Sequence, residues 1–143
     1  MTELRVSTEE AELDVPLIHH FLSKNTYWAK DIPLALVQKA IANSLCFGGF
    51  IGNDQVAFAR VISDYTTFAN LVDVFVLPEH RGRGYSKSLM DAVFSHPQLQ
   101  GLRRFTLATG DAHELYARYG FTAPLFPETL MERYVPNIYA GAV

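Results

Sequence analysis

The feature that most constrains the fold is the run FANLVDVFVL, residues 68–77, which is long and almost entirely apolar. Apolar runs without alternation are typical of a strand covered on both faces, inside a sheet with helices on either side. The run stops at Pro78, and two glycines follow in PEHRGRGYSKSLM. Apolar residues then recur at helical spacing from Tyr85 onward. We therefore expect a buried strand, a glycine-rich loop and a helix in succession.

Further strands are expected on both sides of this unit. Short segments rich in apolar, β-branched and aromatic residues, bounded by turn residues, predict strands at 3–7, 46–52, 55–63, 103–109 and 129–135. The tripeptide Gly-Asn-Asp at 52–54 is a hairpin signal between two of them.

Helix boundaries are marked by polar residues, proline and glycine. Asp14 and Asp31 are each followed by a proline two residues later, which is typical of a helix start. Asp111 and Glu114 form a capping-box pattern, and Gly120 is a helix-ending residue. The element order β-α-α-β-β-β-α-β-α-β predicts an α/β fold with a mixed sheet and helices on its faces, in a single domain covering residues 1–143.

Composition narrows the classes of partner. The net charge of −3 argues against nucleic-acid binding, since phosphate contacts require a basic surplus. No apolar run is long enough to span a membrane, and the acidic start does not resemble a secretory signal. Cys46 is the only cysteine, and the five histidines are scattered, so no metal site and a cytoplasmic location are expected. Cys46 is expected to be a buried small side chain and not a nucleophile.

The loop at residues 81–86 suits a phosphate group. A helix start leaves backbone N–H groups unpaired and carries partial positive charge, and glycine lets the backbone approach a ligand closely. A Walker A loop requires glycine where Ser86 precedes the Lys-Ser pair, and the dinucleotide fingerprint requires glycine at Lys87. The coenzyme A pattern, [QR]-x-x-G-x-[GA], fits at Arg81 and Gly84, with Ser86 as a near match.

With the segment ATGDAHELYARYGF, residues 108–121, this loop makes the chain resemble the GNAT superfamily of acyl-CoA-dependent N-acyltransferases. The resemblance covers most of the chain and is strongest from Val56 to Phe121. It implies that acetyl-CoA is the co-substrate and that its pantetheine arm lies along the main chain of Phe75 and Val76. Thr109, with Asp111 beside it, stands where the family often has asparagine touching pantetheine. The residues implied to hold the pyrophosphate are Arg81, Gly82, Arg83, Gly84, Tyr85 and Ser86.

The resemblance also implies catalytic roles. Tyr116 corresponds to the family's proton donor for the departing thiolate, with packing on one helix face as the alternative explanation. Asp73 stands in an apolar strand, where burial disfavours a charged carboxylate, and it is the first candidate for general base. A structural hydrogen bond is the alternative. Asp64, Tyr27 and Trp28 are expected on the acceptor side, while Tyr27 and Trp28 would also serve as packing between two helices.

These assignments predict an N-acetyltransferase that moves an acetyl group from acetyl-CoA to a primary amine by direct attack. The acceptor is expected to be a small-molecule amine or a peptide amine. Two alternatives stay open: an acyl-CoA sensor without turnover, and an acyltransferase that acts on charged tRNA. The apolar tail VPNIYAGAV, residues 135–143, is compatible with a homodimer contact or with a frayed end.

Overall fold

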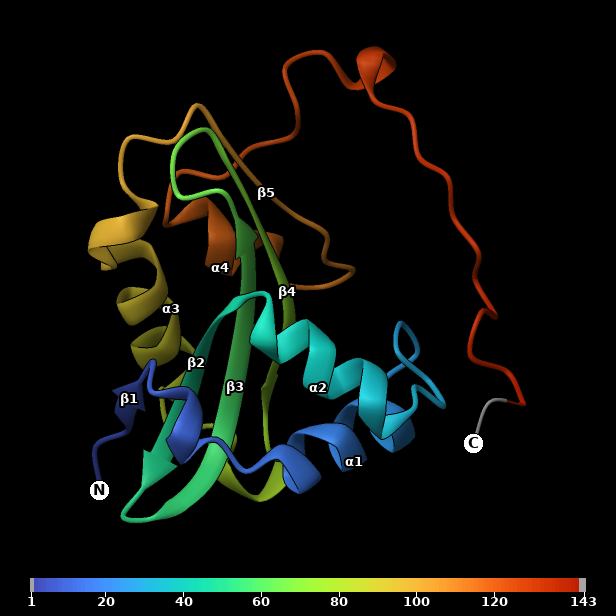
Figure 1. The fold of residues 1–143 in the computed structure, drawn as a ribbon. Helices are drawn as coiled ribbons and strands as arrows, with labels where there is room; N and C mark the ends of the chain where they lie inside the picture. Colours follow the sequence, from blue (N-terminus) through green and yellow to red (C-terminus); the bar gives the residue numbers. More distant parts are fainter. Residues whose placement is uncertain (1, 142–143) are drawn as a thin grey trace.

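The computed structural model describes residues 2–141, which form one five-stranded mixed sheet in the order β1-β2-β3-β4-β5 (Figure 1). The first four strands pair antiparallel, and β5 is parallel to β4. The strands are β1 (Arg5–Ser7), β2 (Leu45–Ile51), β3 (Asp54–Ser63), β4 (Phe68–Val76) and β5 (Arg104–Leu107). The helices are α1 (Val15–Asn25), α2 (Leu34–Ala42), α3 (Tyr85–Ser95) and α4 (His113–Ala117). The predicted mixed α/β architecture is confirmed.

Each face of the sheet has its own apolar core. On one face, α1 and α2 bury Phe58 and Phe75 together with Ile18 and Phe21. On the other face, α3 and α4 pack over Val61 and the neighbouring apolar residues of the sheet. Figure 1 shows α1 and α2 together on one side of the strands and α3 and α4 on the other. The sheet is therefore the middle of three layers, as the long apolar run of β4 indicated.

The local signals near the amino terminus correspond to real boundaries. The Asp14 carboxylate accepts a hydrogen bond from the amide of Leu17 at 3.1 Å and so caps α1. Asp31 lies before α2, but the residue at its N-cap is Pro33 and not an aspartate. The β2–β3 hairpin turns at Gly52 and Asn53, as predicted. These elements bring α1 and α2 onto the face that carries Asp73.

Two irregularities in β4 shape the functional region. Phe58 pairs with Phe75 and Arg60 with Val72, so two residues of β4 oppose one residue of β3. Asp73 lies in this bulge with a φ of 58°, in the left-handed region. On its other edge, β4 pairs with β5 only as far as Leu71. The edge of residues 72–76 is therefore without a neighbouring strand in the described chain.

The predicted start of α4 is wrong in its detail. The helix begins at His113 after an N-cap at Ala112, and no side chain caps it there. The hydroxyl of Thr109 accepts hydrogen bonds from the amides of Ala112 at 3.0 Å and Asp111 at 3.4 Å. Because the helix starts later than expected, Asp111 is part of the preceding turn and the capping box with Glu114 does not form.

The end of α4 agrees with the prediction. Gly120 has a φ of 90°, and the amide of Phe121 donates to the carbonyl of Tyr116 at 3.2 Å. This is the hydrogen bond of a glycine-terminated helix. Phe121 then packs against Phe94 of α3, with 5.2 Å between ring centroids.

The predicted last strand is wrong. Residues 129–135 form no strand and pair with no other element, and every one of them is exposed. They belong to a segment that we name the C-terminal arm, residues 122–138, which arches away from the sheet (Figure 1). The last two residues of the predicted tail, 142–143, lie outside the described residues.

Candidate active site

The glycine-rich loop between β4 and α3 presents a run of unpaired backbone amides. Gly82 and Gly84 have φ values of 78° and 79°, a conformation that is strained for residues with a Cβ. Among residues 2–141, no group accepts a hydrogen bond from any amide between Gly82 and Ser86. The loop is solvent-exposed and leads directly into α3. Successive free amides at a helix start form a concave site for an anion.

The arginines of the loop have different positions. The Nε of Arg81 donates to the carbonyl of Val76 at 2.9 Å, so this side chain fastens the loop to the end of β4. Arg83 and Ser86 are exposed. Exposed guanidinium and hydroxyl donors beside free amides add to the attraction for a phosphate group. The Arg81 side chain thus fixes the loop to β4, while the Arg83 and Ser86 side chains face solvent.

Tyr85 serves mainly as an anchor in this loop. Its side chain is buried, and its hydroxyl donates to the carbonyl of Thr2 at 2.8 Å. The part of Tyr85 that faces the loop is therefore its backbone amide. The resemblance implied that backbone amides of the loop hold the pyrophosphate, and the buried Tyr85 side chain is compatible with that expectation.

Beside the loop, β4 has no neighbouring strand on the β5 side, because the β4–β5 pairing ends at Leu71. Phe75 is fixed from behind, since its ring stacks on Phe21 of α1 at 4.1 Å between centroids. Its side chain and that of Val76 are buried in the two cores. The main chain of these residues lies on the edge that β5 leaves free. A free strand edge can pair with an extended, amide-containing ligand.

At the bulge, Asp73 is held by two donors from other elements. Its Oδ2 accepts from Nε of Arg60 at 2.9 Å, and its Oδ1 accepts from Nε1 of Trp28 at 2.8 Å. The side chains of Arg60 and Asp73 are only 15% and 9% exposed. Arg60 also donates to Ser44 at 2.9 Å. The carboxylate is therefore oriented by two donors and shielded from water.

Sequence reasoning missed Arg60 and Ser44. The available signal was the charge of Arg60 inside the apolar strand QVAFARVIS, because a charged residue in a buried strand requires a partner. The predicted pair Tyr27 and Trp28 is brought to the site. The Tyr27 ring is 78% exposed and meets Trp28 edge-on at 5.2 Å. Trp28 therefore links Tyr27 to Asp73.

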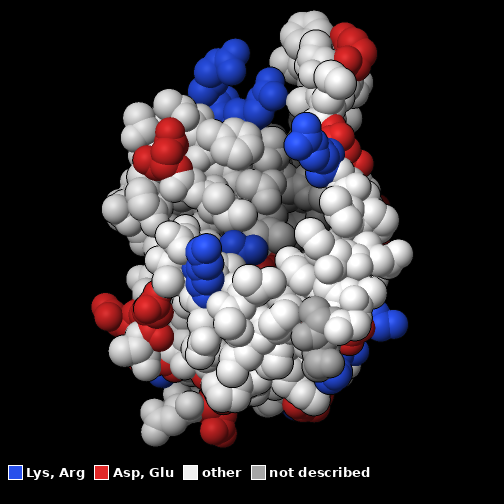
Figure 2. Space-filling model, turned by 45° about the vertical axis from the view of Figure 1, so that its right-hand side comes forward, with Lys and Arg blue, Asp and Glu red and all other residues white. Residues whose placement is uncertain are grey.

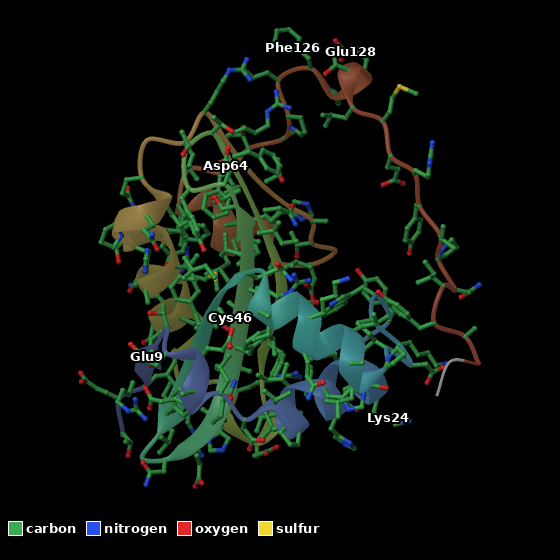
Figure 3. The ribbon with its side chains drawn as sticks, viewed as in Figure 1. Glu9, Lys24, Cys46, Asp64, Phe126 and Glu128 are labelled. Carbon is green, nitrogen blue, oxygen red and sulfur yellow. The ribbon has the colours of Figure 1, made fainter. Side chains whose placement is uncertain are left out.

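Asp64 lies elsewhere. It occupies the turn between β3 and β4 (Figure 3), where its carboxylate accepts hydrogen bonds from the amides of Thr66, Thr67 and Phe68 and from the Thr67 hydroxyl. These donors lower the pKa of Asp64, the Thr67 hydroxyl most of all. All of its contacts are within the turn. The structure does not bring Asp64 together with Tyr27, Trp28 or Asp73.

Tyr116 lies on α4 in the core that α3 and α4 form with the sheet, and it is 8% exposed. Burial, and then the charge of Asp111, raise the pKa of Tyr116 above its ordinary value. The phenol thus keeps its proton at neutral pH. A cavity of about 530 Å³ adjoins the start of α4, and its lining includes Asp111 and Arg118.

Other chemistries have little support in residues 2–141. No group of three or more His, Cys, Asp or Glu side chains converges there as a metal site would require. Burial raises the pKa of the Cys46 thiol to about 12, so the thiolate needed for nucleophilic attack is absent at neutral pH. Within the same residues, every helix is too short or too polar to cross a bilayer.

Comparison with known proteins identifies the family. Residues 42–123 match the model of the acetyltransferase (GNAT) domain. A fungal protein named as an acetyltransferase, FG08082 of Gibberella zeae, is 33% identical over 135 residues, covering 79% of this chain and 75% of that protein.

Solved structures agree with this match. A crystal structure from Xanthomonas campestris pv. campestris, assigned to the GNAT family of acetyltransferases, is 73% identical with a TM-score of 0.95, covering 98% of this chain and 99% of that one. The structure of AAC(6')-Iy with the bisubstrate analogue CoA-S-monomethyl-acetylneamine has a similar fold, with a TM-score of 0.63 at 18% identity, covering 94% and 96% of the two chains. The chain therefore belongs to the GNAT family of acetyltransferases.

Proposed function

We propose that this protein transfers an acetyl group from acetyl-CoA to a primary amine, with both substrates bound at once. The observation that carries the proposal is the run of unpaired amides from Gly82 to Ser86, located where β4 separates from β5. An anion site and a free strand edge side by side match a ligand that joins a pyrophosphate to an extended amide chain.

On the donor side, the loop amides and Arg83 hold the pyrophosphate, and the main chain of Phe75 and Val76 pairs with pantetheine. Thr109 fixes the turn before α4 and, with Asp111, contacts the pantetheine arm from the α4 side. The bound analogue in AAC(6')-Iy joins CoA to an acetylneamine in one molecule. That ligand supports the inference that a GNAT fold can bind the donor and the acceptor at the same time.

The reaction moves one acyl group and one proton. The amine nitrogen attacks the thioester carbonyl carbon, a C–N bond forms and the C–S bond breaks. The Tyr116 phenol gives its proton to the departing CoA thiolate, and the proton lost by the amine passes to Asp73 or to a water beside it. Main-chain amides at the β4 bulge stabilise the oxygen on which negative charge develops. No covalent acyl-enzyme forms, because the single thiol is buried and protonated.

On the acceptor side, Trp28 and Tyr27 supply an aromatic wall next to the Asp73 carboxylate. An ammonium group is attracted both to aromatic faces and to a carboxylate. Asp64 belongs to the acceptor side only if the acceptor extends as far as the β3–β4 turn, since its own contacts are all in that turn. A small amine or a peptide amine fits the remaining residues.

A free-thiol assay with acetyl-CoA and a panel of primary amines tests the proposal. We expect amine-dependent release of CoA well above hydrolysis for at least one acceptor class. The same panel run on Tyr116→Phe should give much lower rates at unchanged cofactor affinity. Tight binding of acetyl-CoA without thiol release from any amine would instead indicate a sensor and would contradict the proposal.

A further inference from the structure

One ion pair of the protein is shielded from water, and it lies at the bulge of β4. The Arg60 and Asp73 side chains are 15% and 9% exposed. The other two ion pairs within residues 2–141 have side chains between 38% and 67% exposed. Figure 2 turns the α1–α2 side of the molecule forward and shows a hollow with a mainly uncharged interior and basic side chains at its rim. A shielded ion pair seldom adds stability over apolar residues of similar volume, so stability alone does not account for this one.

The backbone of Asp73 is unfavourable as well. Its φ of 58° lies in the left-handed region, which brings the Cβ of an L-residue too close to a carbonyl oxygen. Strain of this kind persists only where the surrounding structure holds it, and it is concentrated at functional sites. Asp73 therefore joins two unfavourable features, a shielded ion pair and a left-handed backbone.

The bulge determines which way the residues after it face. Leu71 and Val74 both pack in the core that α3 and α4 form with the sheet, although strand residues three positions apart normally point to opposite faces. The bulge at Asp73 breaks this alternation. From Val74 onward, the conformation of Asp73 therefore sets the direction of the β4 edge that β5 leaves unpaired.

Three segments outside β4 hold this bulge through one carboxylate. The Asp73 oxygens accept from Nε1 of Trp28 at 2.8 Å and from Nε of Arg60 at 2.9 Å. Nη1 of Arg60 donates at 2.9 Å to the hydroxyl of Ser44, which lies between α2 and β2. A planar guanidinium can make both of its contacts at once, whereas a lysine ammonium is a single point charge. Arg60 is therefore fixed by Ser44 on one side and fixes Asp73 on the other.

We propose that Arg60, held by Ser44, is a positioning residue for acetyl transfer and acts through Asp73. By fixing the Asp73 carboxylate, it orients the group that takes up the amine proton beside Trp28. By holding the left-handed backbone at Asp73, it also aims the main-chain amides of the bulge at the thioester oxygen. The inference rests on the proposed function, which assigns these tasks to Asp73 and to the bulge.

The indole of Trp28 tests the positioning without any turnover. Trp28 is the only tryptophan of the chain, so its N–H gives a single indole signal in a nitrogen–proton NMR spectrum. Because this N–H donates to Asp73, its exchange with solvent reports how firmly the carboxylate is held. We expect exchange at least about tenfold faster in Arg60→Gln than in the wild type, with Arg60→Lys and Ser44→Ala in between. Unchanged exchange in all three folded variants would overturn the inference.

Kinetics test whether this positioning serves the transfer. With the best amine of the panel, kcat of Arg60→Gln should fall about tenfold, since a misplacement of about 1 Å can cost up to about a hundredfold. The KM for acetyl-CoA should stay within about twofold, and Arg60→Lys should recover part of the loss. Because Ser44 acts only through Arg60, Ser44→Ala should lower kcat about threefold in the wild type and not at all in Arg60→Gln.

Thr106→Val is the matched control for Ser44→Ala. It removes a part-buried side-chain hydrogen bond of 2.8 Å to Asn70, three residues before Asp73 in β4. It should lower the unfolding midpoint in urea by a similar amount and leave both the indole signal and kcat unchanged. Losses of kcat that follow stability in every variant, the control included, or additive losses in the Ser44→Ala/Arg60→Gln double variant, would overturn the inference while the wild type remains active. A wild type that turns over no amine would instead refute the proposed function, and the indole signal would still decide whether Arg60 holds Asp73.

Discussion

Asp73 combines an unusual backbone conformation with a carboxylate that is bound by two other segments. Its left-handed backbone creates the bulge in β4, and its carboxylate joins α1–α2 to the sheet through Trp28 and Arg60. Removing one member of a shielded ion pair leaves the other without compensation. A change at Asp73 therefore has a structural effect as well as a catalytic one, and an experiment must separate the two.

Asp73→Asn keeps the size of the side chain and removes the charge. If Asp73 is the base, we expect kcat to fall by roughly 10²- to 10⁴-fold, with little change in the KM for acetyl-CoA. The matched control is Arg60→Gln, which leaves the carboxylate but removes its partner. Both variants should lower the free energy of unfolding by about 1–3 kcal/mol in urea titrations. Equal losses of kcat in the two variants would assign Asp73 a positioning role only.

Tyr116→Phe tests the proton donor. We expect a loss in kcat of about a hundredfold, and Tyr119→Phe, which removes a phenol hydrogen-bonded to Asp91, should have little effect on kcat. Because burial raises the pKa of Tyr116, the donor remains protonated, and its ionisation should reduce the wild-type rate only above about pH 10.

The same shift affects stability. In the unfolded chain the phenol ionises near pH 10, while the folded state retains its proton to higher pH. The stabilisation that the buried, neutral Tyr116 phenol contributes to the free energy of unfolding is therefore fully present below about pH 10 and is lost as the pH rises further. Thermal melts across this range should show a smaller decline for Tyr116→Phe than for the wild type. Identical declines would contradict a raised pKa at Tyr116.

At the scale of elements, the loop between β4 and α3 depends on backbone conformation more than on side chains. Gly84→Ala places a Cβ on a residue with a φ of 79°, with no other atom within 4 Å to obstruct it. We expect a stability cost of about 1–2 kcal/mol and a loss of CoA affinity of at least about tenfold, since the Cβ enters the anion site.

Gly52→Ala is the matched control for the loop. Gly52 has a φ of 61°, equally open surroundings and a place in the β2–β3 hairpin. The two substitutions should therefore have similar effects in urea denaturation, while only Gly84→Ala weakens CoA in calorimetry. Equal CoA affinity in both proteins would contradict a role for the Gly84 backbone.

At the start of α4, substitutions of Thr109 and Asp111 should have different effects on stability. Thr109→Ala removes the hydroxyl that accepts from the amides of Ala112 and Asp111, and loss of such a cap costs about 1 kcal/mol. Asp111→Ala removes no helix-capping hydrogen bond and should be nearly neutral in the same urea titration. A larger loss of stability in Asp111→Ala than in Thr109→Ala would instead indicate that Asp111 caps the helix.

The elements that the sequence predicted well are those with strong local signals. The periodicity of α1 and α3, the apolar run of β4 and the turn at Gly52 depend on neighbouring residues only. The start of α4 was misplaced because Thr109 and Asp111 both offer a capping oxygen within one turn, and it is the Thr109 hydroxyl that accepts the amide hydrogen bonds. The strand expected at residues 129–135 has suitable residues, but a strand also requires a partner edge, which the local sequence does not specify.

The candidate site, like the fold, was predictable where its signals are local in the sequence. The loop was recognisable because the spacing of Arg81 and Gly84 is local. The contacts of Asp73 with Trp28 and Arg60 join segments 45 and 13 residues apart, so only the fold reveals them. Asp64 illustrates the converse, since a polar residue near a strand end was expected on the acceptor side, and the hydrogen bonds that its carboxylate accepts all lie in its own turn.

At the scale of the whole molecule, the sheet brings three features to one region: the free loop amides at the end of β4, the β4 edge that β5 leaves unpaired, and the Asp73 carboxylate held by Trp28 and Arg60. This arrangement would allow the proposed donor and acceptor to lie side by side.

The most direct measurement is isothermal titration calorimetry of the purified protein with CoA and with pantetheine, which lacks the pyrophosphate and the phosphorylated adenosine attached to it. The account expects CoA to bind at least about a hundredfold more tightly than pantetheine, because charge-assisted hydrogen bonds to the loop are worth about 1.5–3 kcal/mol each. In Arg83→Glu/Gly84→Ala most of this difference should disappear. No measurable heat with CoA, or equal affinities for the two ligands in the wild-type protein, would contradict a pyrophosphate site at residues 82–86.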